Sequence, residues 1–302
     1  MQDNPLVSII CLCYNHEKYL VETLVSVINQ SYRNIELIIV DDCSSDHSKN
    51  VIENWLKNYP KIQFIANDVN LGNTKSFNKA LQLSKGEYII DLAADDVLFT
   101  DCVAIQLNGF KKSKFKNTGL VYGNAKLISE NGSFISYYFP VNSNQKVTTP
   151  RITGNVYTSI LSGGNAICSV TAMIKKEVFD QLGGYDENLA YEDLDFWIRA
   201  SRIYDFDFID EILIQKRVVK NSLGSDFHIK NNDRSKKINF STYLILKKTL
   251  KLNKTKEENK AVLKRIHFEM ILNFKNRNFR LLLKYLILEI RFRKKFQSLD
   301  EL

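Results

Sequence analysis

The chain has 302 residues, a net charge of +8 at pH 7, and ordinary fractions of apolar (44%) and charged (25%) residues. It is therefore long enough for one large core or two smaller ones, and its composition excludes a disordered chain. No apolar stretch approaches the ~20 residues of a transmembrane helix, and the five cysteines show no C-x-x-C spacing, which disfavours a disulfide framework or a zinc site. We predict a reducing, cytoplasmic location, in solution or peripherally on the inner face of the membrane.

The charge is divided unevenly along the chain. Residues 228–302 carry 20 Lys and Arg against 7 Asp and Glu, whereas residues 1–227 carry 22 against 27. We interpret the chain as a domain over residues 1–224, with parts at about 1–98 and 99–224, followed by a basic helical extension over 225–302.

The first hundred residues alternate between strand and helix patterns. Strands are predicted at 6–13, 35–40, 62–66 and 87–92. Helices are predicted at 17–30, at about 74–83, and after Ser44, Ser45 and Asp46, where a helix would carry Val51, Ile52, Trp55 and Leu56. This order predicts an α/β fold with a doubly wound, mainly parallel sheet, helices on both faces and right-handed crossovers.

The pattern loosens after residue 96. A helix at 100–113 and a strand at 119–129 precede a hairpin signal at Asn131-Gly132. Residues 140–168 are predicted to form a long loop and 206–219 to form short strands; the chain is helical from about residue 225.

Two aspartate pairs follow buried strands. Asp41 and Asp42 end the run ELIIVDD, and Asp95 and Asp96 end the run EYIIDLAADD. Open α/β sheets bind ligands at the carboxyl ends of their strands. Adjacent carboxylates repel each other unless a cation or hydrogen-bond donors hold them. The pairs therefore predict a site for a polar ligand.

The motifs, taken in order, resemble the family-2 glycosyltransferases of the GT-A fold over roughly residues 5–220. The first strand with Tyr14 and Asn15, then VDD-x-S-S-D, resembles the opening of that family. NLGNTKSFNKAL with KGEYIIDLAADD resembles its second block, and GGYDENLAYEDLDFWIRAS its acceptor-side block.

The resemblance implies a divalent cation, Mn²⁺ or Mg²⁺, at Asp95 and Asp96, where it would neutralise charge on a leaving diphosphate. Asp96 would contact the metal, and Asp95 the metal and the sugar or ribose; Asp95 as a helix cap is the alternative. Ala93 departs from the family's Asp-x-Asp-Asp pattern.

A second departure concerns a late histidine that some family members use as a metal ligand. Val219 stands at its position, His228 is interpreted as a surface residue, and Arg217 or Lys220 is an alternative phosphate contact.

The resemblance also implies a nucleotide-sugar site. Asp42 would accept a hydrogen bond from the base, while Asp41 joins it or braces the turn. Tyr14 is interpreted as a base contact or as core, and Lys75 as a phosphate contact or a solvated residue. The full predicted set is Leu12, Tyr14, Asn15, Glu17, Asp41, Asp42, Lys75, Asn78 and Asp95.

In the acceptor-side block, Asp193 matches the family's catalytic base and Arg199 its partner; Asp193 as a helix cap is the alternative. A base that takes the acceptor proton contributes roughly 10²–10⁴ in rate. Glu192 and Trp197 are predicted on the acceptor side, with Trp197 walling the pocket. Since successive helical residues lie ~100° apart, Glu192, Asp193 and Asp195 cannot all enter one cleft.

The basic tail has a helical pattern of its own. On a helix over 277–296, five basic residues share one side and Phe279, Leu282, Leu286 and Ile290 lie opposite. This pattern suits an anionic membrane surface; packing of the helix on its own domain is the alternative. Nucleic acid binding is not predicted.

The resemblance implies an inverting, metal-dependent transfer of a sugar from a UDP-hexose or UDP-N-acetylhexosamine to a glycan. A lipid-linked acceptor, in surface polysaccharide or lipopolysaccharide synthesis, fits the basic tail. The alternative is a catalytically silent nucleotide-binding or membrane-associated module, for which Ala93 is the hint. The donor sugar, the acceptor and the oligomeric state stay open.

Overall fold

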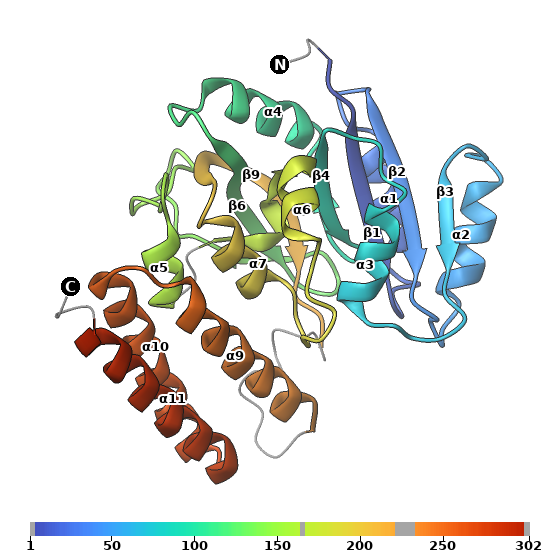
Figure 1. Cartoon of the computed structure of the whole chain (residues 1–302). Coiled ribbons are helices and arrows are strands. Elements are labelled where there is room, and N and C mark those ends of the chain that lie inside the picture. Colours follow the sequence, from blue (N-terminus) through green and yellow to red (C-terminus); the bar gives the residue numbers. More distant parts are fainter. Residues whose placement is uncertain (1–3, 164–166, 221–232, 299–302) are drawn as a thin grey trace.

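The computed structural model describes residues 4–163, 167–220 and 233–298. Figure 1 shows a sheet covered by helices on both faces, with three long C-terminal helices at one end. The strands are β1 (Val7–Cys13), β2 (Ile35–Asp41), β3 (Gln63–Ala66), β4 (Tyr88–Ala93), β5 (Val97–Leu98), β6 (Thr118–Ile128), β7 (Phe134–Tyr137), β8 (Met173–Lys175) and β9 (Asp205–Arg217). The helices are α1 (Leu20–Ile28), α2 (Ser48–Leu56), α3 (Asn73–Leu81), α4 (Cys102–Lys112), α5 (Tyr157–Leu161), the short η1 (Ser169–Thr171), α6 (Lys176–Leu182), α7 (Asp193–Ala200), α9 (Asp233–Leu252), α10 (Lys256–Lys275) and α11 (Phe279–Ser298).

The sheet has the order β3-β2-β1-β4-β8-β6-β9-β5, and β7 pairs with β6. The first four strands in this order are parallel, which confirms the predicted β-α-β series. β8 then runs antiparallel to both β4 and β6, so the complete sheet is mixed. β1 lies between β2 and β4, and this is the point where the strand order reverses.

Side chains alternate between two cores along the buried strands, because successive strand residues point to opposite faces. From β1, Ile10 joins the core that contains α3, α6 and α7, while Ile9 and Cys11 join the core beneath α1, α2 and α4. Both cores are apolar, which explains why the strand sequences read as continuous apolar runs rather than alternating ones.

The second half of the domain departs from prediction in two places. Residues 205–217 form the single strand β9 rather than short strands, because β9 pairs along the whole length of β6. The predicted loop over 140–168 contains the short helix α5. The hairpin at Asn131-Gly132 is confirmed: β6 and β7 are antiparallel, and Gly132 has a φ of +83°.

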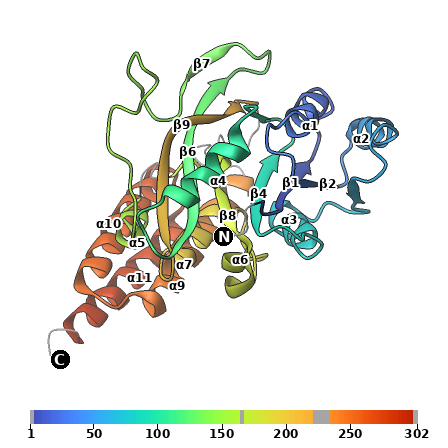
Figure 2. The ribbon, with the colours of Figure 1, turned by 90° about the horizontal axis from the view of Figure 1, so that it is seen from above.

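The C-terminal helices pack on the domain. Ile238 and Ile245 of α9 and Val262 of α10 belong to the core that also holds α5 and α7. Figures 1 and 2 place the three helices at the end of the molecule opposite α2 and β3. In the part of the chain that the structure describes, no helix is long and apolar enough to cross a membrane. The boundary predicted at residue 224 and His228 lie outside the described residues.

Candidate active site

Both aspartate pairs lie beside the carboxyl end of β1. Cys13 pairs with Asp41 of β2, and Leu12 pairs with Ala93 of β4. The strand register therefore brings Asp41–Asp42 and Asp95–Asp96 to the two sides of the loop after β1, at the edge where open α/β sheets bind ligands.

Side-chain and backbone donors of the chain bind the Asp42 carboxylate. Its Oδ1 accepts hydrogen bonds from Asn67 Nδ2 (2.9 Å), Ser76 Oγ (2.8 Å) and Leu71 N (2.9 Å), and its Oδ2 accepts one from Gly72 N (2.8 Å). A carboxylate with four donors fixes the turn that leads into α3. Its predicted contact with a base would have to use the remaining acceptor capacity of Oδ2.

Asp41 is less completely paired. Its Oδ2 accepts a hydrogen bond from Ser44 N at 3.1 Å, which is the predicted bracing of the turn. Its Oδ1 is buried without a hydrogen-bond partner. Leaving a buried carboxylate oxygen unpaired costs free energy unless a ligand completes it.

The loop after β1 is tied to the loop after β2. Asn15, with a φ of +60°, donates its N–H to Ser44 Oγ and accepts at Oδ1 from Ser45 N. Glu17 accepts at Oε2 from His47 N at 2.8 Å. Asn15 and Glu17 therefore hold the two loops together, and Tyr14, in the loop after β1, is about half exposed.

Leu12 and the two predicted residues of α3 lie in different surroundings. Leu12 is partly buried, and its carbonyl accepts from Ala94 N. Lys75 is exposed. Asn78 is buried: its Nδ2 donates to Tyr185 O and Glu187 Oε1, and its Oδ1 accepts from Tyr185 N. The Asn78 amide thus holds the segment after Gly184 rather than facing open space.

Arg217 fixes the second aspartate pair. Its backbone N donates to Asp96 Oδ1 at 2.8 Å, and its Nε donates to the Asp95 carbonyl at 3.1 Å. Its remaining guanidinium nitrogens contact the carbonyls of Ser129 and Glu130 and the carboxylate of Glu22. Four of the five guanidinium N–H donors therefore have protein partners, and the alternative in which Arg217 contacts phosphate would have to use the remaining one.

The second pair suits a cation. Burial, together with the charge of Asp95, raises the pKa of Asp96 to about 8. A divalent cation would reverse this penalty, and carboxylate oxygens are the ligands that Mg²⁺ and Mn²⁺ prefer. In the described part of the chain no three His, Cys, Asp or Glu side chains gather to hold a metal. Asp95 and Asp96 would therefore share the ion with oxygens of a ligand.

Three more carboxyl groups meet near the start of α7. Burial and the charge of the neighbouring Asp193 raise the pKa of Glu192 to about 7, although a hydrogen bond with Asn73 acts to lower this pKa. Burial also raises the pKa of Asp193, whose Oδ1 accepts from Leu194 N at 2.6 Å. Asp91 of β4 has a pKa well above its usual range from burial and the charge of Glu192, and it accepts a hydrogen bond from Tyr185 OH.

The remaining carboxylate of this block, Asp195, is buried and paired with two cations of the chain. Its Oδ2 accepts from Arg199 Nε at 2.7 Å and its Oδ1 from Lys248 Nζ of α9 at 2.6 Å. This confirms that Glu192, Asp193 and Asp195 do not all enter one cleft. It also corrects the expected pairing, because Arg199 binds Asp195 and not Asp193.

Trp197 lies in the core. It is 6% exposed and packs edge-on against Phe196 and Phe206. Residue 197 follows Asp193 by one helical turn, so the two residues share a face of α7, and the predicted place of Trp197 on the wall of an acceptor pocket stays a prediction.

Sequence reasoning missed two residues near the site, His16 and Asp91, and the role of a third, Arg217. His16 Nε2 lies 3.9 Å from Asp95 Oδ2, Asp91 contacts Tyr185, and Arg217 holds Asp95 and Asp96. The signal for Asp91 was present, since a carboxylate inside an otherwise apolar strand run needs a partner. The partners of His16 and Arg217 are distant in sequence.

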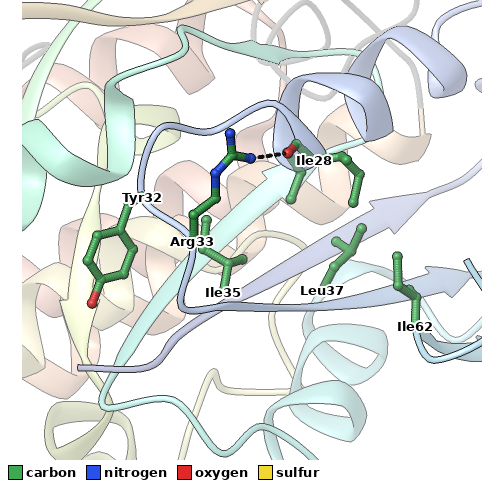
Figure 3. A pocket seen from close by; sticks show the side chains of 7 residues that line it. Ile28, Tyr32, Arg33, Ile35, Leu37 and Ile62 are labelled. Carbon is green, nitrogen blue, oxygen red and sulfur yellow. Dashed lines mark hydrogen bonds between the residues drawn. The ribbon is translucent and has the colours of Figure 1, made fainter. Parts of the chain in front are cut away.

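A pocket of about 200 Å³ lies elsewhere, between the end of α1 and β2 (Figure 3). Ile28, Tyr32, Ile35 and Ile62 line it, and Arg33 donates to the Ile28 carbonyl at its rim. It lies at the amino end of β2, opposite the aspartate pairs, and has no carboxylate in its lining.

The model of the family described as "Glycosyl transferase family 2" matches residues 8–183. Over 249 residues the chain is 30% identical to an uncharacterized glycosyltransferase of Methanocaldococcus jannaschii, which covers 78% of this chain and 82% of the relative. The chain belongs to glycosyl transferase family 2. The match includes both aspartate pairs and ends before Glu192 and Asp193.

This family-2 glycosyltransferase is also 29% identical over 239 residues to chondroitin synthase of Escherichia coli. That match covers 78% of this chain and 32% of the relative, so the chain spans about a third of that protein's length.

Two solved structures share the fold. TarS 1-349 from S. aureus in complex with UDP-GlcNAc has a TM-score of 0.63 at 19% identity, covering 89% of this chain and 73% of that TarS chain. The mannosyltransferase PcManGT from Pyrobaculum calidifontis, in complex with GDP-Man and Mn²⁺, has a TM-score of 0.57 at 15% identity, covering 98% and 84%. These similarities confirm the GT-A fold with C-terminal helices.

Proposed function

We propose that this glycosyltransferase moves a sugar, with inversion, from a UDP-linked hexose or N-acetylhexosamine to a hydroxyl of a glycan acceptor. The observation that carries the proposal is the placing of two aspartate pairs on the two sides of the carboxyl end of β1, with a third carboxyl group at the start of α7. The donor class is supported by the complexes of TarS with UDP-GlcNAc and of PcManGT with GDP-Man.

In this proposal Asp193 takes the proton of the acceptor hydroxyl as the new bond forms. Its raised pKa makes it a stronger base than an exposed aspartate, and its bond to Leu194 N keeps one oxygen in place. Glu192 and Asp193 repel each other, so near pH 7 the pair favours a single negative charge. With Asp193 on the acceptor side, attack comes from the side opposite the diphosphate.

Asp95 and Asp96 would hold Mn²⁺ or Mg²⁺, which supplies positive charge to the leaving diphosphate. Asp42, Asn15 and Glu17 shape the nucleotide side of the site through the loops after β1 and β2. Metal use is supported by the Mn²⁺ in the PcManGT complex and by the buried carboxylate pair.

The acceptor we propose is a lipid-linked glycan, as in the assembly of surface polysaccharide or lipopolysaccharide. Such an acceptor lies at a membrane surface, and the excess of basic residues over 228–302 fits that place. A cytoplasmic protein held peripherally at the membrane would meet both its donor and its acceptor there.

The deciding experiment measures release of UDP from a panel of UDP sugars with a glycan acceptor, with and without Mn²⁺. We expect metal-dependent release, and we expect Asp193→Asn to lower the rate by roughly 10²–10⁴ while UDP binding, measured by calorimetry, is kept. The matched control is Asp180→Asn, because Asp180 is exposed on α6 and pairs with Lys176. Full transfer by Asp193→Asn would refute the role of this base.

A further inference from the structure

Eight large apolar side chains on α10 and α11 are exposed. Each is 40–63% exposed, and we call them the apolar stripe: Phe268, Ile271, Phe274, Phe279, Leu283, Leu286, Ile287 and Ile290. The rings of Phe274 and Phe279 lie 6.3 Å apart and join the two helices where they meet. Soluble monomers rarely leave contiguous apolar surface of this kind uncovered unless it binds something.

The stripe is not the face through which α11 packs. Leu281, Tyr285, Leu288 and Phe292 form that face and are at most 4% exposed. At 100° per residue they lie on the side of the helix opposite Leu283, Ile287 and the rest of the stripe. One apolar face of α11 is therefore buried in the core, and a second apolar face is exposed.

The predicted basic side of α11 is only partly free. The Lys284 ammonium lies over the rings of Phe240 and Tyr243, and Lys295 donates to the carbonyls of Leu250 and Asn253. These two cations hold α11 to α9. The exposed basic residues of α10, α11 and the turn between them include Lys264, Lys275, Arg277, Arg280, Arg291, Arg293 and Lys294.

The charge of this surface distinguishes two candidate binding partners, a second copy of the chain and a lipid membrane. Residues 256–295 contain 12 Lys and Arg against 4 Asp and Glu. Three of the acidic side chains are already paired: Glu258 with Arg202, Glu269 with Arg265, and Glu289 with His267 and Arg293. Two copies meeting through the stripe would oppose cations to cations, whereas an anionic lipid surface matches both the charge and the apolar side chains.

We propose that the apolar stripe of α10 and α11 inserts into the interfacial region of an anionic membrane, with the flanking cations contacting lipid headgroups. The helix pair then lies in the plane of the membrane and does not span it. The helix pair lies at the end of the molecule away from α2 and β3, and α10 packs beside α5 (Figure 1).

The test is sedimentation of the full chain with vesicles of phosphatidylcholine alone or mixed with phosphatidylglycerol. We expect binding to the anionic vesicles that weakens as salt is raised. The variant Leu283→Gln with Ile287→Gln should bind the anionic vesicles at least roughly tenfold more weakly. The variant Arg291→Gln with Lys294→Gln should bind them roughly fivefold more weakly for each charge removed. Ile135→Gln is the matched control, since Ile135 is an equally exposed apolar residue on β7.

Circular dichroism and UDP binding are measured for each variant to check that its fold is kept. The proposal is overturned if the wild-type chain does not bind anionic vesicles, or if the stripe variants bind them as well as the control Ile135→Gln does. It is equally overturned if sedimentation equilibrium shows a dimer that Leu283→Gln with Ile287→Gln dissociates, because the stripe would then bind a second copy.

Discussion

At the scale of single residues, the carboxyl groups of the site differ in how far the protein satisfies their charge. Asp42 has four donors, and Asp195 has Arg199 and Lys248. Asp96 and Glu192 have raised pKa values of about 8 and about 7, because burial and a like-charged neighbour outweigh their hydrogen bonds. The protein itself therefore satisfies the first two, whereas in the proposed function the last two would bind a cation or exchange a proton.

The raised pKa of Glu192 predicts a pH dependence of stability. The folded chain holds this proton up to about pH 7, whereas the unfolded chain releases it near pH 4.3. Relative to Glu192→Gln, the free energy of unfolding of the wild-type chain should therefore fall between those pH values, by at most about 1.4 kcal/mol per pH unit. Urea titrations from pH 4.5 to 8 measure this difference.

The control for that comparison is Glu53→Gln, at an exposed position on α2. Its stability should follow the wild-type chain across the same range. A constant difference between the wild-type chain and Glu192→Gln would show that the Glu192 pKa is not raised.

Arg217 gives the second prediction at this scale. Lysine has no planar fork, so Arg217→Lys cannot keep the contacts to the carbonyls of Asp95, Ser129 and Glu130 together. We expect a loss of about 1–3 kcal/mol in stability and a several-fold higher Mn²⁺ concentration for half-maximal UDP release. Arg33→Lys, at an exposed arginine far from the aspartate pairs, should change neither. An unchanged Mn²⁺ dependence in Arg217→Lys would argue against its positioning role.

At the scale of elements, α3 and the segment before α7 are joined by one side chain. Asn78 makes three hydrogen bonds to Tyr185 and Glu187. Gly184 has a φ of +78°, and a Cβ there would lie 2.6 Å from Asn78 Oδ1. Both the backbone conformation and the close approach therefore require glycine at 184. The contact matters for function because this segment leads to Glu192 and Asp193.

The adjacent glycine provides a matched comparison. Gly183 has a φ of +74°, but a Cβ there would meet nothing within 4 Å. Gly183→Ala should cost about 1–2 kcal/mol from its backbone conformation alone, and Gly184→Ala clearly more. In an Asn78→Ala background the excess cost of Gly184→Ala should shrink, and urea denaturation of the four chains measures this coupling. Equal costs for the two glycines would contradict the close contact.

The elements also show which features a sequence predicts. The strands β1 to β4 and the helices between them follow from continuous apolar runs and helical spacing, which are local signals. The single long β9 was missed because its length depends on pairing with β6, nearly ninety residues earlier in the chain. The partner of Arg199 was wrong for a related reason: the motif gives the spacing of its residues, but the packing of α7 against its neighbours decides which carboxylate Arg199 meets.

At the scale of the whole molecule, composition separates the chain into two regions while packing joins them. The charge difference between residues 1–227 and 228–302 is real, yet Lys248 of α9 binds both Asp186 and Asp195. Arg202 binds Glu258 of α10 and lies over the ring of Tyr157. The extension is therefore basic on its outside and part of the main core on its inside.

This joint packing predicts how the chain unfolds. Because α9 and α10 share one core with α5 and α7, the C-terminal helices should not melt before the domain. Calorimetry should show one transition with equal calorimetric and van't Hoff enthalpies. Lys248→Met should lower its midpoint without splitting it, since Asp195 keeps Arg199 but loses one of two cations while buried. Lys247→Met, next along α9, is the control. A separate low-temperature transition would show that the extension is an independent unit, and the proposed membrane surface would then move on its own relative to the site.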